Sequence, residues 1–178
     1  DAVPIVLDVH SPDEIVAAVK AIAPSFGGIN LEDIAAPQCF EIEDRLKAAL
    51  DIPVMHDDQH CTAIVVLAAL INACKVTNRD INTTKIVLVG AGAAGIAVVK
   101  LIHLYAPQAQ IIAVDSKGIV SASRTDLNSE KSKLLEFSVG DKDGSLSDAL
   151  VGADIFIGLS KANLLKAEDI KTMAKDAI

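Results

Sequence analysis

Two acidic pairs carry the strongest chemical signal in this chain. Asp57 and Asp58 lie in the segment HDDQHCTA, residues 56–63, between a short apolar segment and a long apolar stretch. Glu32 and Asp33 form the second pair, in the segment NLED. Desolvating an unpaired carboxylate is costly, so a pair in apolar surroundings indicates a cation or a partner that neutralises it. Both pairs are therefore candidates for a metal or catalytic site.

Carboxylate oxygens are ligands that Mg²⁺ and Mn²⁺ prefer, together with waters and substrate oxygens. Glu32 and Asp33 follow a predicted strand at 28–31, and Asp57 and Asp58 follow one at 53–55. We therefore expect both pairs to project from the carboxyl edge of one sheet, where three carboxylates would leave metal positions open for a substrate. His56 and His60 flank Asp57 and Asp58 and are expected to have a supporting role. The alternative is that each pair only caps the next helix.

Three glycines form a second chemical motif. Gly90, Gly92 and Gly95 give the pattern GxGxxG between an apolar strand at 85–89 and a predicted helix at 95–105. This is the context of a dinucleotide-binding loop, in which the first glycine permits the turn, the second leaves room for the pyrophosphate and the third allows close helix packing. The amide groups of the helix then face the phosphates. The alternative is that the glycines only shape the turn.

Further cofactor candidates lie at the ends of later strands. Asp115 ends the strand predicted at 110–114, where a carboxylate can accept hydrogen bonds from ribose hydroxyls, which favours NAD. Lys117 can instead pair with a 2′-phosphate, so NADP remains open. Ser160 follows a strand predicted at 154–158 and is a candidate for the same crevice, although a serine there often caps a turn.

Composition excludes several classes of protein. A chain of 178 residues that is 51% hydrophobic can bury a core, and a net charge of -8 without a basic cluster argues against nucleic-acid binding. The longest apolar run, about 63–74, is short for a membrane span and contains Asn72, so it predicts a buried helix. Cys39, Cys61 and Cys74 show no CxxC or zinc spacing, which indicates reduced thiols in a cytoplasmic protein.

Short apolar runs alternate with helical patterns, which predicts an α/β fold with a doubly wound, mostly parallel sheet of the Rossmann type. The segment SPDE at 11–14 is a capping box that predicts a helix from there to about residue 22. The polar stretch 77–84 is expected to be a loop within one domain, between a metal-ligand-bearing half, 1–80, and a glycine-loop half, 81–178. The expected strands are 4–8, 28–31, 53–55, 85–89, 110–114 and 154–158, and the other expected helices are 41–50, 62–76, 95–105, 129–137 and 167–174.

Six sequence blocks, in order along nearly the whole chain, closely resemble the bacterial-type malic enzymes. The blocks are GGINLEDI, APQCFEIE, IPVMHDDQH, VGAGAAGIA, VDSKG and GADIFIG. Malic enzymes oxidise (S)-malate with NAD or NADP and decarboxylate the resulting oxaloacetate to pyruvate and CO₂, using Mn²⁺ or Mg²⁺. The resemblance implies this oxidoreductase activity, a small-molecule substrate, and a homodimer or larger homo-oligomer.

The resemblance also assigns roles by motif. Glu32, Asp33 and Asp58 become the metal ligands, and Asp57 becomes a supporting residue near the general base. The implied cofactor residues are Thr62, near the nicotinamide or the metal; the phosphate loop of Gly90, Ala91, Gly92, Ala93, Ala94 and Gly95; and Asp115, Ser116 and Lys117 around the ribose.

Two departures from the family pattern affect this reading. The family usually has glycine where this chain has Cys61, so a side chain is added where the backbone packs closely. The family's general-base lysine and acid tyrosine belong to a segment that would precede Asp1, and its substrate-binding asparagines would follow Ile178. We therefore expect little or no malate turnover by this chain alone.

Two other functions share part of the pattern. Another two-domain dehydrogenase, such as an amino-acid dehydrogenase, would have the glycine loop without needing the acidic pairs. A non-catalytic dinucleotide-binding sensor would bind the cofactor with no metal dependence. The paired carboxylates argue against the sensor.

Overall fold

The computed structural model describes residues 2–140 and 142–178, and the chain forms two compact units, Asp1–Asp58 and Gln59–Ile178. We expected one domain with a seam at 77–84. The boundary between the two compact units lies after Asp58, so nearly all of the long apolar helix belongs to the glycine-loop unit.

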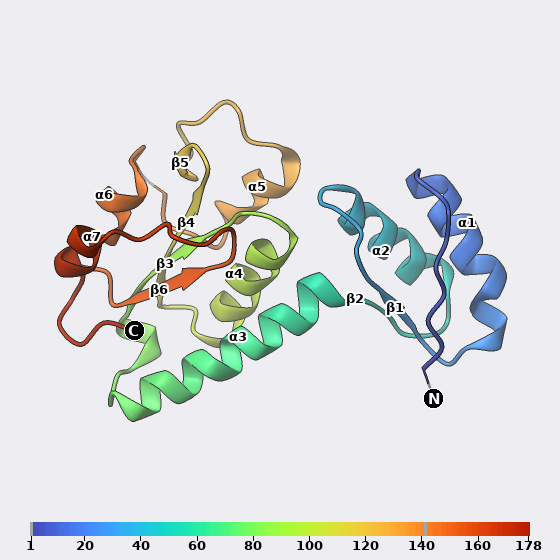
Figure 1. Cartoon of the computed structure of the whole chain (residues 1–178), viewed down its shortest axis with the longest axis horizontal. Coiled ribbons are helices and arrows are strands. Elements are labelled where there is room, and N and C mark those ends of the chain that lie inside the picture. The colour runs from blue at the N-terminus through green and yellow to red at the C-terminus, as the bar shows by residue number, and fades with distance from the viewer. Residues whose placement is uncertain (1, 141) are drawn as a thin grey trace. The chain divides into compact units, whose positions relative to one another are not determined.

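The first unit contains a two-stranded parallel sheet and two main helices (Figure 1). Ser11 caps the first helix as predicted: its hydroxyl accepts the Glu14 N–H, and the Glu14 carboxylate accepts the Ser11 N–H. The elements are α1 (Pro12–Ile22), the 3-10 helix η1 (Ala23–Ser25), β1 (Ile29–Leu31), α2 (Gln38–Ala49) and β2 (Val54–His56).

The strand predicted at 4–8 is absent, and that prediction is wrong. Residues 2–10 form no regular element. Apolar residues form a strand only where a neighbouring strand takes up their backbone hydrogen bonds. No strand of the first unit pairs with this segment, and Val6 is almost fully exposed within the structure.

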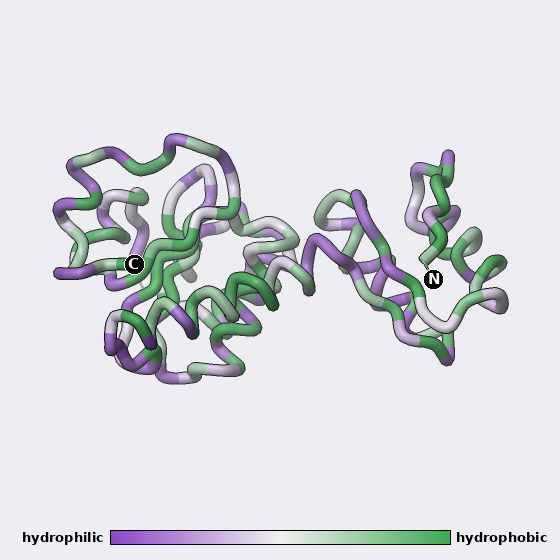
Figure 2. The backbone as a smooth tube through the Cα atoms, turned by 60° about the horizontal axis from the view of Figure 1, so that its bottom comes forward, coloured by the Kyte–Doolittle hydropathy of each residue, from purple (hydrophilic) through white to green (hydrophobic). Residues whose placement is uncertain are grey.

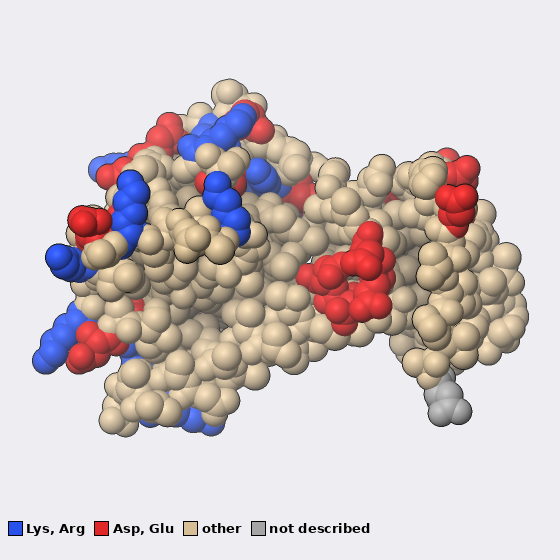
Figure 3. Space-filling model, in the orientation of Figure 1, with Lys and Arg blue, Asp and Glu red and all other residues tan. Residues whose placement is uncertain are grey.

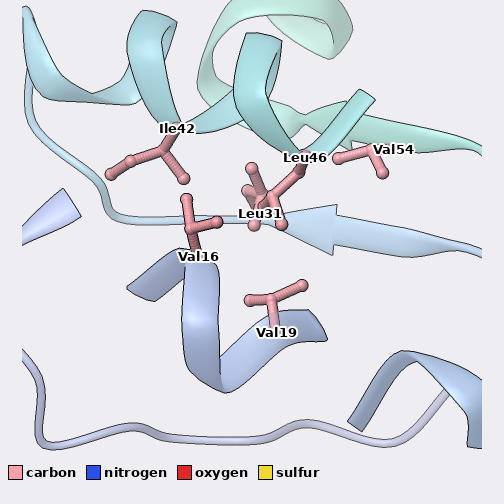
Figure 4. Packing of buried hydrophobic residues seen from close by; sticks show 6 residues of the cluster. All are labelled: Val16, Val19, Leu31, Ile42, Leu46 and Val54. Atoms are coloured by element: carbon pink, nitrogen blue, oxygen red, sulfur yellow. The ribbon is translucent and has the colours of Figure 1, made fainter. Parts of the chain in front are cut away.

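The core of the first unit lies between its helices and its small sheet. Figure 4 shows side chains from all four elements pointing toward one another. Ile42 and Leu46 of α2 are fully buried in this cluster. The full cluster is Val16, Val19, Leu31, Ile42, Leu46 and Val54.

The second unit is built on a four-stranded sheet in the order β5-β4-β3-β6. β3 (Lys85–Val89) pairs in parallel with both β4 (Gln110–Asp115) and β6 (Ile155–Gly158), and the short β5 (Gly118–Ile119) is antiparallel to β4. The sheet is therefore mostly parallel, as predicted.

Helices cover both faces of this sheet. Val87 and Val89 of β3 pack with Ala149 and Leu150 of α6, while Leu88, on the opposite face, lies against the start of α4. This arrangement confirms the predicted α/β, Rossmann-type fold. The helical elements are α3 (Asp57–Val76), the 3-10 helix η2 (Ile81–Thr83), α4 (Ala93–Tyr105), α5 (Ser129–Leu134), α6 (Leu146–Leu150) and α7 (Ala167–Thr172).

The shortest elements were not predicted. β5 has two residues and α6 has five, too few for an apolar period to be recognised. The helix predicted at 62–76 begins earlier, at Asp57, so the two aspartates occupy its first turn.

The length of α3 changes one expectation. Figure 2 shows hydrophobic residues along much of α3 and in the sheet strands. The apolar run at 63–74 belongs to a helix of 20 residues that is long and apolar enough to cross a membrane, judged by length and composition within the described residues. A core helix of a soluble protein meets the same two criteria. The absence of a membrane span stays a prediction.

The burial of Ile42 gives a direct test of this fold. Ile42→Ala should lower the free energy of unfolding by about 2–5 kcal/mol, because it opens a cavity in the α1–α2 core. The matched control Ile64→Ala removes a side chain that is 57% exposed and should change it by less than about 1 kcal/mol. Urea unfolding followed by circular dichroism measures both values. Equal losses in the two variants would contradict the assigned core.

Candidate functional site

The glycine loop joins β3 to α4, and position 90 requires glycine for two reasons. Gly90 has φ +116, in the left-handed region that other residues rarely adopt, and a Cβ there would lie 2.9 Å from the Leu159 carbonyl carbon. The Gly90 N–H donates to the Val114 carbonyl at 2.9 Å, which ties the loop to the end of β4. The turn is therefore held between two neighbouring strands.

Gly92 and Gly95 have opposite surroundings. A Cβ at Gly95 would lie 1.7 Å from the Gly90 carbonyl oxygen, so the helix and the turn are in direct backbone contact. A Cβ at Gly92 would meet nothing within 4 Å. Gly92 is the N-cap of α4 and has no side-chain cap hydrogen bond. The loop thus has the close packing and the open space that a pyrophosphate cradle requires.

The loop after β6 reaches the same edge of the sheet. Gly158 pairs with Val89, the residue before Gly90, and the Leu159 N–H donates to the Val89 carbonyl at 2.8 Å. The backbone nitrogen of Ser160 would be 3.2 Å from a Cβ at Gly90. Ser160 is exposed beside the glycine loop, in the region where we expected it.

Asp115 lies at the end of β4, but its carboxylate is already occupied. Oδ1 accepts hydrogen bonds from the Lys117 N–H at 2.9 Å and from Arg124 at 2.8 Å. Oδ2 accepts from Arg124 at 3.1 Å and from Lys131 Nζ at 2.6 Å. A carboxylate has about four acceptor sites, so protein donors fill the capacity that we expected a ribose to use.

Arg124 and Lys131 were missed in the sequence. They lie in the loop after β5 and in α5, and no short spacing relates them to Asp115. Arg124 also binds Asp126 through two hydrogen bonds of 2.9 Å, and Lys117 Nζ reaches Asp126 at 2.6 Å. The predicted phosphate partner Lys117 is therefore ion-paired, although its side chain is 66% exposed.

This network lowers the pKa of both acids. Burial alone would raise the pKa of Asp115, but the hydrogen bonds from Arg124 and Lys131 outweigh it and lower the pKa to about 2. Hydrogen bonds from Arg124 and Lys117 lower the pKa of Asp126. Both carboxylates are consequently held in the charged form.

The acidic pairs follow two paired strands in the first unit. β1 and β2 are parallel, with Leu31 opposite His56, so Glu32 and Asp57 continue from the same edge, as predicted. Figure 3 shows acidic side chains gathered where β2 runs into α3. The Asp33 N–H donates to Asp58 Oδ2 at 3.2 Å, with Asp33 at φ +56.

The side chains do not form a closed metal cluster. Within residues 2–140 and 142–178, no group of three or more His, Cys, Asp and Glu side chains is arranged to hold a metal ion. Asp33 meets Asp58 through its backbone, and the Asp58 side chain is 49% exposed. The donor set is nevertheless all carboxylate and lies at one sheet edge, which fits the oxygen ligands of Mg²⁺ and Mn²⁺ in type and location.

His56 and Glu43 lie beneath this edge. The His56 N–H donates to Glu43 Oε1 at 3.1 Å, and that same oxygen is 2.9 Å from Lys47 Nζ. The His56 ring is fully buried, and neither ring nitrogen has a hydrogen-bond partner in the described structure. Its Nε2 atom is 3.9 Å from Asp58 Oδ2, beyond hydrogen-bond distance.

Asp57, Thr62 and the three cysteines were also singled out in the sequence. Asp57 and Thr62 are half-buried in the first two turns of α3. Cys39 and Cys74 are buried, and Cys61 is partly exposed. Burial raises the pKa of the Cys39 thiol to about 11, which makes it unreactive at neutral pH.

Comparison with known families decides what these sites belong to. Residues 60–177 match the family model described as "Malic enzyme, NAD binding domain", and residues 7–47 match "Malic enzyme, N-terminal domain". The chain belongs to the malic enzyme family. The resemblance seen in the sequence is therefore confirmed, and the division after Asp58 falls between the two family models.

Individual malic enzymes match over all or nearly all of the chain. The NAD-dependent malic enzyme of Geobacillus stearothermophilus is 52% identical over 100% of this chain and 37% of its own length. The NADP-dependent malic enzyme of Rhizobium meliloti is 47% identical over 97% of this chain and 23% of its own. The crystal structure of the NAD-dependent malic enzyme from Thermotoga maritima has a TM-score of 0.94 at 44% identity, over 99% of this chain and 48% of that chain. This chain spans less than half the length of each.

Two glycine variants test the loop. Gly95→Ala should lower the free energy of unfolding by about 3 kcal/mol or more, because its Cβ would overlap the Gly90 carbonyl and force the backbone to move. Gly92→Ala has open space and should cost about 1 kcal/mol or less. Chemical denaturation measures both. A Gly95→Ala protein as stable as Gly92→Ala would show that the helix and turn are not in contact.

The pKa of Asp115 predicts part of the acid sensitivity. Its pKa is lower in the folded chain, about 2 against 3.8, so the unfolded chain binds the proton more readily. Asp115 therefore contributes about 2 kcal/mol of stability above pH 4, and this is lost as pH falls from about 4 to 2. In Asp115→Asn the acid-induced loss of stability should be smaller by that amount. Asp8→Asn, which removes an exposed carboxylate, is the control, and an acid profile of Asp115→Asn equal to wild type would refute the assignment.

Proposed function

We propose that this chain forms the dinucleotide- and metal-binding part of a malic enzyme, which converts (S)-malate to pyruvate and CO₂ with NAD or NADP. The observation that carries the proposal is the glycine loop. Gly95 is in forced backbone contact with the turn, while Gly92 faces open space at the N-terminus of α4. The family match to the NAD-binding domain covers this loop.

The phosphate cradle follows from the start of α4. The backbone of Gly92 to Gly95 presents amide groups that no side chain caps, and a helix N-terminus attracts phosphate. Ala91, Ala93 and Ala94 add no polar side chain that could compete for these amides. Ser160 supports the same site from the loop after β6.

The adenosine end of the cofactor meets the Asp115 network. For Asp115 to bind a ribose hydroxyl, one of its donors, the Lys117 N–H, Arg124 or Lys131, must release a hydrogen bond. Lys117 can reach a 2′-phosphate by leaving Asp126. Either cofactor therefore requires one hydrogen bond of this network to open, and Ser116, between Asp115 and Lys117, remains an assignment by resemblance.

The metal role is assigned to Glu32, Asp33 and Asp58. When bound, the metal supplies positive charge that polarises the hydroxyl and carboxylate of malate. The carboxyl ends of β1 and β2 carry these residues, and the Asp33 amide holds one oxygen of Asp58. Asp57 supports this edge from the first turn of α3, and Thr62 is assigned to the nicotinamide or metal by resemblance only.

The broader expectations remain part of the proposal. A homodimer or larger homo-oligomer, a cytoplasmic location, and the absence of nucleic-acid and membrane partners follow from resemblance and composition. The family match removes support for an amino-acid dehydrogenase. A metal-independent sensor is separated from a malic enzyme by the experiment that follows.

A chimera tests the function directly. In the Geobacillus stearothermophilus enzyme, the matching 37% is replaced by this chain. The chimera should form NAD(P)H from malate only with Mn²⁺ or Mg²⁺, and Asp58→Asn should lower kcat/KM by about 100-fold or more. Asp51→Asn, an exposed carboxylate of the same unit, should leave kcat/KM unchanged.

The isolated chain completes the comparison. It should bind NADH, seen as a change in NADH fluorescence, yet give little or no malate turnover. A folded chimera that binds NADH but forms no NAD(P)H from malate would refute the proposal. Metal-dependent malate turnover by the isolated chain would refute the expectation that its proton-transfer groups lie elsewhere.

A further inference from the structure

His56 is the feature that the proposed roles leave unexplained. Its ring is fully buried, yet among the described residues neither Nδ1 nor Nε2 has a hydrogen-bond partner. Nearly all buried polar side-chain atoms in folded proteins are hydrogen-bonded, because an unpaired one loses its bonds to water without replacement. A buried histidine in this state indicates a partner that the free chain does not bring close enough.

The nearest acceptor is the carboxylate of Asp58. His56 Nε2 is 3.9 Å from Asp58 Oδ2, about 1 Å longer than a usual N–H···O hydrogen bond. The same oxygen accepts the Asp33 N–H at 3.2 Å. Asp58 therefore lies between a backbone donor on one strand end and a ring nitrogen on the other.

The backbone of His56 is held independently of its ring. Its N–H donates to Glu43 Oε1 at 3.1 Å, and it sits in β2 opposite Leu31 of β1. Glu43 is itself buried and within 2.9 Å of Lys47 Nζ. The ring is consequently fixed beneath the sheet edge, while the Asp58 side chain, 49% exposed, is the part that can move.

We propose that His56 is a positioning residue for the Asp58 carboxylate: its Nε2–H donates to Asp58 when a divalent cation binds. Donors of this kind fix the orientation of a ligating carboxylate and are worth about 10- to 100-fold in metal affinity. This inference rests on the proposed metal role of Asp58. Full burial keeps the ring itself from reaching a cation on the exposed side of that carboxylate, and the carboxylate set suits Mg²⁺ or Mn²⁺ without nitrogen.

Two substitutions of equal length isolate the hydrogen bond. Glutamine at position 56 places an amide N–H where the imidazole Nε2 lies, whereas methionine fills a similar volume without a donor. In the 178-residue chain, Mn²⁺ affinity is measured by electron paramagnetic resonance of the free ion. We expect His56→Gln to bind Mn²⁺ within about 3-fold of wild type, and His56→Met to bind about 10-fold or more weakly.

Controls separate this role from folding. Val54→Ala, in the same strand, removes apolar packing and should lower stability without changing the Mn²⁺ affinity of the folded protein. Circular dichroism establishes that each variant is folded. Equal affinities of His56→Gln and His56→Met would overturn the positioning role.

A different variant, Asp58→Asn, tests the proposed metal role itself. Asp58→Asn should abolish Mn²⁺ binding, and if it does while the two His56 variants agree, only the His56 inference fails. If Asp58→Asn binds Mn²⁺ like wild type, or if wild type does not bind it, the proposed metal role fails as well. Direct nitrogen coupling to bound Mn²⁺ in pulsed resonance spectra would show His56 to be a ligand and would overturn its positioning role.

Discussion

The backbone contact between Gly95 and the Gly90 carbonyl is the constraint on which the second unit depends. The two backbone segments are so close that a Cβ at position 95 would not fit, so the first turn of α4 lies against the end of β3. Because β3 is an interior strand, paired with β4 and β6, this contact also sets where both neighbouring strand ends lie relative to the helix.

Asp115 and His56, two polar side chains of the candidate sites, differ in how many hydrogen bonds they make with the protein. Asp115 receives four hydrogen bonds from protein donors, so its acceptor capacity is filled before any ligand arrives. The ring of His56 receives none from the described residues. A saturated group must exchange one bond to bind a ligand, whereas an unsatisfied group gains one, so the two sites respond to their ligands in different ways.

The division after Asp58 places the two predicted sites in different units. The first unit holds the predicted metal carboxylates at the ends of two paired strands, and the second holds the glycine loop. Each unit has its own core, so each local geometry is maintained by its own packing.

The sequence alone was enough to identify the family, the glycine loop and the strand ends at which the candidate site residues lie. Ser11 and Glu14 predicted the start of a helix, and the apolar runs at 85–89 and 110–114 predicted two strands. Both signals come from residues close together in the sequence, so they can be recognised without the fold. The absent strand at 4–8 marks the limit of this reasoning, since apolar residues become a strand only where a partner strand exists.

Only the tertiary structure decided which side chains meet. Arg124 and Lys131 reach Asp115 through a turn and a short helix whose directions no local pattern encodes. The buried, unpaired ring of His56 is equally invisible in sequence, where the residue is simply a neighbour of two aspartates. Hydrogen-bond satisfaction depends on distances between distant segments, and those distances are set by packing of the whole unit.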